Sequence, residues 1–470
     1  MYIHVRQVVL LSLVSWLSLT SAHSFDSSSY PPEDVITRDI CIIGGGSSGT
    51  FAAVQLHDTG KSVVVVERND RLGGHTETYI DPATKTPVDL GVVDFNNIDA
   101  VKNYFARLNV SYFVANNSGS SASSPTYYAD FSTGDVFPNF VPPDPTAALR
   151  LYAAQLANYP YLTAGFDLPS PIPEDLLLPF GQWVTKYGLQ DAVFVIFSYA
   201  GGIGNLLEQP TLYVIKLIGL DLLNTLQIGF INTVSNDNSE IYTKAFNVLG
   251  ESNVLLCSHV IATNRGSDAE YVKVLVQTSN NVTKLIQAKK LVISIPPKLD
   301  NLVGFDLSEE EIGLFCQFRS AAYYTALLTN TGINSTFSVL NVNLNKPYDL
   351  PILPAPYNFL PSPVPSLTHL YYGSDDLLAE EQVKEDIIKS VLLLQKNLTT
   401  GTSMAPSFVV FSTHAPFEMT VPTSAIAKGF YKDLYGLQGQ RRTYYTGAAF
   451  HTQDSALLWR FTEALSTIVA

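Results

Sequence analysis

The arrangement of apolar and polar positions predicts a strand–turn–helix–strand unit near the start of the chain. Residues 39–43 and 63–66 are short apolar runs, typical of strands that are buried on both faces. The stretch between them has the composition of a helix, and Gly60 follows it where a left-handed C-terminal residue is expected. The unit ends near Arg68, so the chain opens with a βαβ motif.

The pattern changes twice farther along the chain. Helical segments are predicted at 146–158, over much of 181–220 with a break near Gly201, and at 378–395. Alternating apolar and polar positions predict strands at 254–260, 271–277, 283–287 and 290–294. Strands that could rejoin the first sheet therefore come late, which indicates a nucleotide domain interrupted by substrate-domain insertions. Two domains in simple succession are the alternative.

The predicted fold class is α/β, with a Rossmann-like domain and an interleaved α+β substrate domain. Residues 1–22 form a leader, 36–100, 241–300 and 426–470 belong to the nucleotide domain, and 101–240 and 301–425 belong to the substrate domain.

The first turn carries Gly44, Gly46 and Gly49 in the spacing of a dinucleotide fingerprint. The first glycine permits the tight turn, the second lets the backbone approach the phosphates, and the third lets the helix pack on the sheet. The start of the helix, near Ser48, offers free N–H groups and a positive dipole end to an anion. Glu67 follows at the distance where a carboxylate accepts hydrogen bonds from a ribose hydroxyl. A bound dinucleotide explains all of these residues together.

The first residues have the pattern of a secretory signal peptide. An apolar run at 8–19 follows Arg6 and is succeeded by small residues, so cleavage is expected after Ala22, with an uncleaved anchor as the alternative. No later segment has the pattern of a membrane span. We therefore expect a protein of the secretory pathway, lumenal or secreted. It carries N-glycosylation sequons at Asn109, Asn116, Asn281, Asn334 and Asn397.

Composition narrows the possible partners. The 470 residues suffice for two or three domains, and the net charge of −14 argues against nucleic acid. Of the three cysteines, Cys41 is expected in the core, while Cys257 and Cys316 are the pair that could form a disulfide. Their spacing forms no metal site. The low share of charged residues, 15%, is consistent with an apolar interior and an aromatic-lined pocket.

A second glycine-rich segment follows Glu67. It runs Arg68-Asn69-Asp70-Arg71-Leu72-Gly73-Gly74-His75-Thr76-Glu77-Thr78. It resembles the Arg-x-Gly-Gly-Arg-x-x-Ser/Thr motif of flavoproteins of the glutathione-reductase superfamily, in the amine-oxidase-like branch, although His75 stands where that family has arginine. The resemblance implies an FAD-binding domain of the GR2 type, so the dinucleotide is expected to be FAD.

Later segments agree with that resemblance. Residues 88–91 resemble the loop that approaches the isoalloxazine ring, 258–261 the strand whose backbone meets the adenine, and 291–297 the strand before a Pro-Pro pair. Residues 445–450 lead into a helix from Ser455 with Asp454 as its N-cap, and in the family such a helix points at the flavin pyrimidine ring. The implied FAD contacts are Gly44, Gly46, Ser48, Gly49, Glu67, Arg68, Arg71, Gly73, Gly74, His75, Thr76, Val260, Gly447 and Ala448.

Within the superfamily, the chain is similar to fungal proteins of the beta-cyclopiazonate dehydrogenase family. The leader, the Gly-Gly-His variant and the Thr-Gly-Ala-Ala-Phe segment at 446–450 carry this similarity. It implies dehydrogenation or oxidative cyclisation of a specialised metabolite. We expect a small apolar substrate of prenylated or terpenoid type.

A second fingerprint is imitated at Gly201-Gly202-Ile203-Gly204, followed by Asp221. Leu207 stands where the third glycine belongs, and Pro210 falls inside the helix that would follow. We therefore predict a turn between helices and no NAD(P) site there. Without nicotinamide, molecular oxygen is the expected electron acceptor.

The sequence offers few catalytic groups. The tyrosine pairs Tyr127-Tyr128, Tyr323-Tyr324 and Tyr371-Tyr372 each offer one side chain for a pocket. His369, His451 and Tyr324 are the candidates for catalysis, against the alternative that they are ordinary packed residues. His75 and His451 are the candidates for a covalent bond to the flavin.

Three other functions remain open at this stage. A flavin-dependent isomerase would take a hydride and return it, with no net oxidation. An amine oxidase would place an aromatic cage beside the flavin. A protein that stores or binds flavin without catalysis would hold flavin that no substrate reduces.

Overall fold

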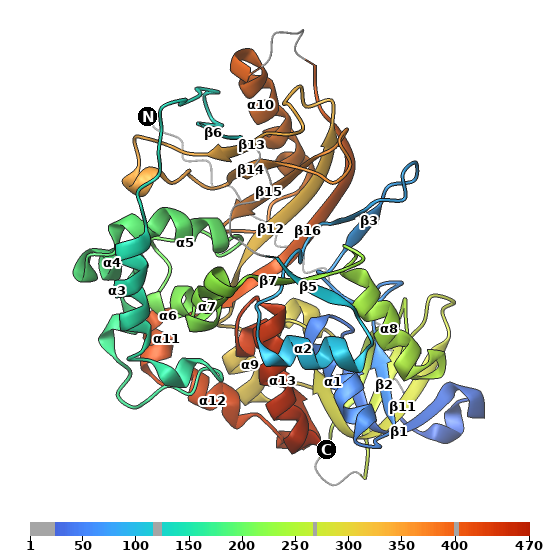
Figure 1. Cartoon of the computed structure of the whole chain (residues 1–470). Coiled ribbons are helices and arrows are strands. Elements are labelled where there is room, and N and C mark those ends of the chain that lie inside the picture. The colour runs from blue at the N-terminus through green and yellow to red at the C-terminus, as the bar shows by residue number, and fades with distance from the viewer. Residues whose placement is uncertain (1–23, 116–124, 267–269, 399–403) are drawn as a thin grey trace, which may run out of the picture.

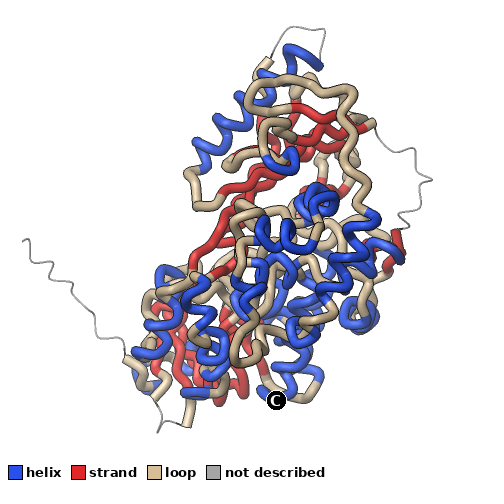
Figure 2. The backbone as a smooth tube through the Cα atoms, turned by 90° about the vertical axis from the view of Figure 1, so that its left-hand side faces the viewer, coloured by secondary structure: helices blue, strands red, loops and turns tan. Residues whose placement is uncertain are grey.

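The structure is a computed structural model that describes residues 24–115, 125–266, 270–398 and 404–470. The predicted leader and the sequon at Asn116 lie outside these residues. One large sheet forms the lower region, a second sheet forms the upper region, and helices gather beside their junction (Figure 1). A view from the side shows strands following one another along the long axis, with most helices on one side (Figure 2).

The lower sheet has seven strands in the order β8-β2-β1-β11-β10-β9, with β17 beside β11. They are β1 (Val35–Ile43), β2 (Val63–Val66), β8 (Val254–Leu255), β9 (His259–Asn264), β10 (Val272–Gln277), β11 (Thr283–Ile293) and β17 (Thr443–Tyr445). β1 pairs in parallel with β2 and β11, whereas β10 is antiparallel to β9 and β11. Segments that are far apart in the chain thus form one sheet.

Helices cover both faces of this sheet, which explains why all four valines of β2 are buried. One face is covered by α1 (Ser47–Asp58), α2 (Asp99–Arg107), α8 (Ser239–Leu249) and α13 (Ser455–Val469). The indole of Trp459 in α13 stacks on Phe51 of α1, with ring centroids 6.0 Å apart, and on Phe95 at 5.4 Å. The helix after the fingerprint and the helix nearest the C-terminus are therefore packed against each other.

The upper sheet has six strands in the order β16-β12-β15-β14-β13-β6. They are β6 (Thr126–Ala129), β12 (Arg319–Thr329), β13 (Ser338–Asn341), β14 (Ala355–Pro361), β15 (Thr368–Ser374) and β16 (Ser407–Thr420). One face packs under α10 (Glu380–Leu398) through its apolar stripe. The long strands β12 and β16 extend from this sheet toward the lower region (Figure 1).

Shorter elements fill the space between the two sheets. The helices are α3 (Thr146–Leu156), α4 (Phe180–Tyr187), α5 (Val193–Tyr199), α6 (Thr211–Leu217), α7 (Leu220–Ile228), α9 (Glu309–Phe315), α11 (Thr423–Ala427) and α12 (Phe430–Gly436). Two ribbons pair β3 (Thr78–Ile80) with β4 (Pro87–Asp89) and β5 (Tyr112–Ala115) with β7 (Phe230–Thr233). Among the described residues, one stretch, Thr211–Ile228, is long and apolar enough to cross a membrane; 56% of it is buried inside the protein, as in a core helix.

The predicted fold class is confirmed, and several local predictions are confirmed in detail. Gly60 has a φ of 82°, in the left-handed region, and Asp454 caps α13 through its side chain. The break near Gly201 is a turn between α5 and α6, and Pro210 is the N-cap of α6, so no second nucleotide fingerprint is formed there. The strands predicted at 283–287 and 290–294 are one strand, β11, and the strand predicted at 254–260 is divided into β8 and β9.

The disulfide that could have joined Cys257 and Cys316 is not formed. All three cysteines are free. Cys257 lies at the edge of the lower sheet, where its N–H donates to the carbonyl oxygen of Asn69, whereas Cys316 is exposed at the end of α9. Cys41 is fully buried in β1, as predicted.

Candidate functional site

The fingerprint turn and the second glycine segment approach each other through their backbones at Gly46 and Gly74. Gly44 has a φ of 98°, and a Cβ on Gly49 would lie 2.0 Å from the carbonyl oxygen of Gly44, so neither position accepts a larger residue. A Cβ on Gly74 would lie 3.0 Å from the Cα of Gly46, and the N–H of Gly73 donates to the Gly45 oxygen at 2.8 Å. The two glycine segments therefore form one bare backbone surface, as a pyrophosphate requires.

The start of α1 is open to an anion. Gly46 is the N-cap residue and provides no side-chain hydrogen bond, so the first N–H groups of the helix have no capping side chain. Ser48 is buried in the first turn. The positive end of the helix dipole thus points at the glycine surface.

Glu67 lies at the end of β2, where it holds the fingerprint turn. One of its carboxylate oxygens accepts from the Gly45 N–H at 2.7 Å and the other from the Asn69 N–H at 2.8 Å. The Ser258 N–H donates to the Glu67 carbonyl at 2.8 Å, which brings the start of β9, with half-buried Val260, to the same edge of the sheet. Arg68 is exposed beside it. The positions implied for ribose and adenine therefore lie together.

Arg71 organises the second glycine segment from within. Its guanidinium donates to the carbonyl oxygens of Gly74 at 3.0 Å and Thr76 at 2.9 Å, and it pairs with Glu77 at 2.9 Å. The Thr76 hydroxyl in turn donates to the Tyr242 hydroxyl at 3.3 Å. Arg71 therefore fixes the shape of the segment that presents Gly73, Gly74 and His75.

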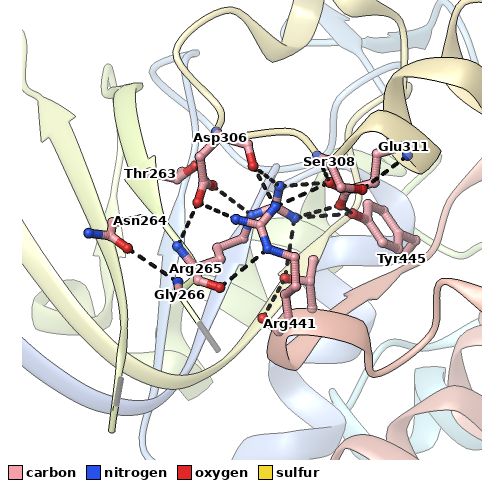
Figure 3. Close-up of polar contacts among 10 residues, drawn as sticks. Thr263, Asn264, Arg265, Gly266, Asp306, Ser308, Glu311, Arg441 and Tyr445 are labelled. Atoms are coloured by element: carbon pink, nitrogen blue, oxygen red, sulfur yellow. Dashed lines mark hydrogen bonds and ion pairs between the residues drawn. The ribbon is translucent and has the colours of Figure 1, made fainter. Parts of the chain in front are cut away.

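A buried ionic cluster positions β17, the strand that leads to Gly447. The Arg265 guanidinium is fully buried and pairs with Glu311 at 2.7 Å and Asp306 at 2.9 Å; Arg441 pairs with the same two carboxylates (Figure 3). The Tyr445 hydroxyl donates to Glu311 within this cluster. We call Arg265, Asp306, Glu311, Arg441 and Tyr445 the Arg265 cluster.

The backbone after Tyr445 continues into the predicted flavin end of the site. Gly447 has a φ of 106°, and a Cβ there would lie 3.1 Å from the Ser294 carbonyl oxygen, in the strand-to-Pro-Pro segment. Ala448 follows in a short 3-10 turn. The Asp454 side chain accepts from the Leu457 N–H at 2.8 Å at the start of α13, and burial raises the pKa of this carboxyl to about 6.

Aromatic side chains form a continuous wall from His75 into the upper sheet. The ring centroids of His75 and Phe417 are 5.8 Å apart, those of Phe417 and Tyr323 5.1 Å, and those of Tyr323 and Tyr371 5.6 Å, with all three pairs stacked. His414 stacks on His75 at 4.7 Å. We call these five residues the aromatic wall.

The wall is partly open to solvent. His75, Phe417, Tyr323 and Tyr371 are only half-buried, although protein surrounds His75 and both tyrosines deeply enough to shift their pKa values. Burial, and then the neighbouring His414, lowers the pKa of His75 to about 3, so its imidazole is neutral at physiological pH. His75, Phe417 and the two tyrosines therefore offer a substrate uncharged, flat surfaces.

His414 and Phe417 were not among the residues predicted for the site. Both lie in β16, where His414 is the register partner of Tyr323 and hence lies on the same face of the sheet. A Cβ on Gly202 would lie 2.5 Å from the Phe417 ring, which explains the glycine that imitated a fingerprint. Only the pairing of β16 with β12 could have revealed these residues, because neither belongs to a local motif.

Tyr324 is not a catalytic candidate in this structure. Successive residues of a strand point to opposite faces, and Tyr323 occupies the face that carries the wall. Tyr324 points to the α10 face, where its hydroxyl donates to the Leu378 carbonyl and accepts from the Leu378 N–H. Of the tyrosine pair at 371–372, Tyr371 lies in the wall and Tyr372 is buried under α10.

The two candidate histidines lie in different places. His369 lies on the wall side of β15, with its ring centroid 4.5 Å from that of Tyr371, and burial lowers its pKa to about 4. His451 lies beside the start of α13, where its Nε2 is 2.9 Å from the Lys216 Nζ and 3.2 Å from the Thr163 carbonyl oxygen. Only His369 adjoins the wall directly.

FAD fits the residues that the structure brings together. The bare glycine surface and the open start of α1 suit the pyrophosphate, and the Glu67 carboxylate stands where a ribose is expected. His75 lies in the aromatic wall, and the turn Ala448–Phe450 after Gly447 contacts β16, so a flavin ring held between them would meet a substrate on the wall. Among the described residues, no cluster of His, Cys, Asp and Glu could hold a metal ion.

Comparison with known proteins agrees with this geometry. Residues 42–108 match the family model for an NAD(P)-binding Rossmann-like domain. The chain is 38% identical to the FAD-dependent oxidoreductase pigF of Monascus ruber, over 97% of each chain. It is 34% identical to beta-cyclopiazonate dehydrogenase of Aspergillus oryzae, over 98% of each chain.

A solved structure shares the whole fold. The fatty acid isomerase from P. acnes that produces CLA superposes with a TM-score of 0.74, at 17% identity, over 92% of this chain and 98% of the isomerase. At that identity the likeness concerns the fold alone. The two fungal relatives, by contrast, match in sequence over nearly their full length, so the chain belongs to the family of fungal FAD-dependent oxidoreductases that includes beta-cyclopiazonate dehydrogenase.

Proposed function

We propose that the protein oxidises a small, apolar specialised metabolite of prenylated or terpenoid type, by dehydrogenation or oxidative cyclisation. The observation that carries this proposal is the aromatic wall. It begins at His75, in the segment that resembles the FAD motif, and continues into the upper sheet through Phe417, Tyr323 and Tyr371. A flat apolar substrate on this wall would lie beside the flavin.

FAD, when bound, supplies the acceptor for a hydride. The residues of the chain have the remaining tasks. The wall holds the substrate by ring stacking and excludes water from the C–H bond that breaks. The positive end of the α13 dipole stabilises negative charge at the pyrimidine end of the site.

Molecular oxygen is the proposed final electron acceptor, with hydrogen peroxide as its product. The support is the turn at Gly201–Gly204, which contacts Phe417 and Tyr323 instead of forming a nicotinamide site. An acceptor other than nicotinamide is therefore needed for turnover.

The direct test uses beta-cyclopiazonate, the substrate named for a relative, together with a panel of prenylated indoles and terpenoids. Anaerobic mixing with the purified holoenzyme should bleach the visible flavin absorbance, and air should restore it with one peroxide formed per product. A flavin that stays oxidised with every compound would overturn the proposal.

Two other outcomes identify the alternatives. A product isomeric with the substrate, formed without oxygen uptake, would mark an isomerase. Peroxide formed only from amines would mark an amine oxidase. Acid precipitation of the same holoenzyme tests covalent attachment, since a yellow pellet would mean a covalent bond, for which His75 and His451 are the candidates, whereas a yellow supernatant means free FAD.

We further propose that the protein follows the secretory route and loses residues 1–22. The sequons at Asn109, Asn281 and Asn334 are exposed, whereas the Asn397 amide donates to the Gly134 carbonyl oxygen at 2.6 Å, which makes it the least available for a glycan. Expression in a fungal host should give secreted protein that begins at His23 and loses mass on deglycosylation. Retention of the full-length chain inside the cell would contradict this route.

A further inference from the structure

A small cavity lies between the start of α13 and the junction of α6 with α7. Its volume is about 40 Å³, which is room for about three water-sized groups. The lining is mostly apolar, and its charged and titratable side chains are Lys216, Asp221, His451 and Arg460. None of the five residues of the aromatic wall is part of this lining. The cavity is therefore separate from the surface proposed for the substrate.

The basic groups of the lining converge on one backbone turn. Lys216 donates to the Leu162 carbonyl oxygen, and its Nζ lies 2.9 Å from Nε2 of His451. This Nε2 is 3.2 Å from the Thr163 carbonyl oxygen, to which the Arg460 guanidinium donates at 3.0 Å. An amine, an imidazole and a guanidinium from separate elements therefore meet beside the cavity.

The negative charge near these groups is already used or distant. The Asp221 carboxylate accepts from Arg460 at 2.7 Å. Lys216 is only 3% exposed, and among the described residues no carboxylate lies within ion-pair distance of its Nζ. Glu418 acts on the lysine through its charge alone, from farther away. Lys216 is thus a buried amine without a counter-ion, and burial lowers its pKa well below the usual range.

Two buried nitrogens of the lining also have no hydrogen-bond partner among the described residues. They are Nδ1 of His451 and Nε of Arg460. A protonated Lys216 donates to Nε2 of the imidazole, and the ring hydrogen then lies on Nδ1. Both unpartnered nitrogens are then donors, so a ligand in this cavity has to be an acceptor.

We propose that the cavity binds a small monovalent anion, of the size of chloride or formate, as the counter-ion of Lys216. Water would accept from the same donors, but it brings no charge to the buried ammonium. The volume excludes a larger organic anion. This inference does not depend on the substrate or on the oxidation.

Binding of the anion should be coupled to uptake of a proton. Burial favours the neutral form of Lys216, whereas an anion beside it favours the ammonium, so the affinity for the anion should fall as pH rises. The charged and titratable groups that act on the lysine are His451, Arg460, Asp221 and Glu418. Burial raises the pKa of Glu418 to about 8, so in alkali this group adds a competing negative charge, which acts in the same direction.

The test uses chloride nuclear magnetic resonance on the purified holoenzyme, at constant ionic strength. The wild type should broaden the chloride line, and formate should remove this excess width, whereas gluconate, which is too large for the cavity, should not. The excess width should be at least about threefold greater at about pH 6 than at about pH 9. Lys216→Met should abolish it. The matched control is Lys428→Met, which replaces an exposed lysine at the end of α11 and should keep the wild-type signal.

A second variant keeps the test decisive if Lys216→Met does not fold. Arg460 is partly exposed, and Arg460→Gln should weaken chloride binding about threefold or more by removing one donor. Equal excess widths in the wild type, Lys216→Met and Arg460→Gln would place the anion elsewhere and overturn the proposal. A wild type without excess width would mean that the cavity takes up water alone, which overturns it as well.

Discussion

Two buried groups of charged side chains differ in how completely their charges are paired. In the Arg265 cluster, two guanidiniums face two carboxylates, and each carboxylate accepts hydrogen bonds from both arginines (Figure 3). In the second group, near the start of α13, Nζ of Lys216 lies 2.9 Å from Nε2 of His451, and Glu418 acts on the lysine through its charge from beyond ion-pair distance. Nδ1 of the histidine and Oε2 of the glutamate have no hydrogen-bond partner among the described residues. We call these three residues the Lys216 cluster.

The two clusters differ in the direction in which the pKa values of their charged side chains are shifted. Burial lowers the pKa of Lys216 well below its usual range. Burial also raises the pKa of Glu418 to about 8. Both shifts favour the neutral form of the side chain. In the Arg265 cluster, burial would raise the pKa values of Asp306 and Glu311, but the hydrogen bonds that these carboxylates accept and the charge of Arg265 outweigh it and hold both pKa values below their usual range. The paired charges of the Arg265 cluster therefore hold neighbouring segments together, whereas the unpaired groups of the Lys216 cluster change protonation state more readily.

The largest effect is expected when Arg265, the central residue of the Arg265 cluster, is replaced. Arg265→Met leaves Glu311 and Asp306 with only part of their partners in a buried site, so we expect a loss of about 3–5 kcal/mol in the free energy of unfolding. Chemical denaturation followed by circular dichroism measures it.

The matched control is Arg442→Met. Arg442 is half-exposed, and among the described residues its side chain donates to the Glu270 carbonyl oxygen alone, so the change should cost less than about 0.5 kcal/mol. Equal losses in the two variants would show that the pairing in the Arg265 cluster does not stabilise the fold.

A smaller effect on stability is expected when Glu418 of the Lys216 cluster is replaced. The folded pKa of Glu418 is raised by burial to about 8, so the stability it contributes is present in acid and is lost as pH rises from the unfolded value through about 8. Glu418→Gln removes this loss, and its melting temperature should exceed that of the wild type by roughly 1–3 °C at the alkaline end of the range.

The Arg265 cluster should behave in the opposite sense. The folded pKa values of Asp306 and Glu311 are lowered, so their contribution is present at neutral pH and is lost as pH falls through the folded values. Glu311→Gln should therefore lower the melting temperature most at neutral pH and least in acid. Melting temperatures of Glu311→Gln and Glu418→Gln, measured across pH against the wild type, test this. The same pH trend in both variants would contradict the difference between the two clusters.

The smallest effect is expected for Lys216→Met. The lysine donates to the Leu162 carbonyl and contacts His451, but its burial without a close carboxylate offsets much of that gain. Its replacement should change the free energy of unfolding by no more than about 1 kcal/mol in either direction. A loss comparable to that of Arg265→Met would show that the two clusters are energetically alike.

The sequence predicts best what depends on neighbours in the chain. The fingerprint glycines, the Gly60 helix end and the Asp454 cap are each defined by a few adjacent residues, and all three adopt the predicted conformations. The second glycine segment is equally local, because Arg71 bonds the backbone of its own loop.

The sequence predicts poorly what depends on strand pairing. Period-two alternation shows that Tyr323 and Tyr324 face opposite ways, but only the packing of α10 decides which of them faces the wall. His414 and Phe417 enter the site through the register of β16 against β12. The sequence likewise could not place Cys257, at the edge of the lower sheet, relative to Cys316, at the end of α9.

The packing of α13 on α1 has a consequence for how the protein is made. The fingerprint helix leaves the ribosome early, but Trp459, which fills the space against Phe51, is translated near the end of synthesis. Until then the apolar surface of α1 lacks its cover, and the nascent chain depends on chaperones or on delayed collapse to avoid aggregation. The face of α1 that packs on α13 is therefore complete only when the last residues of the chain have been translated.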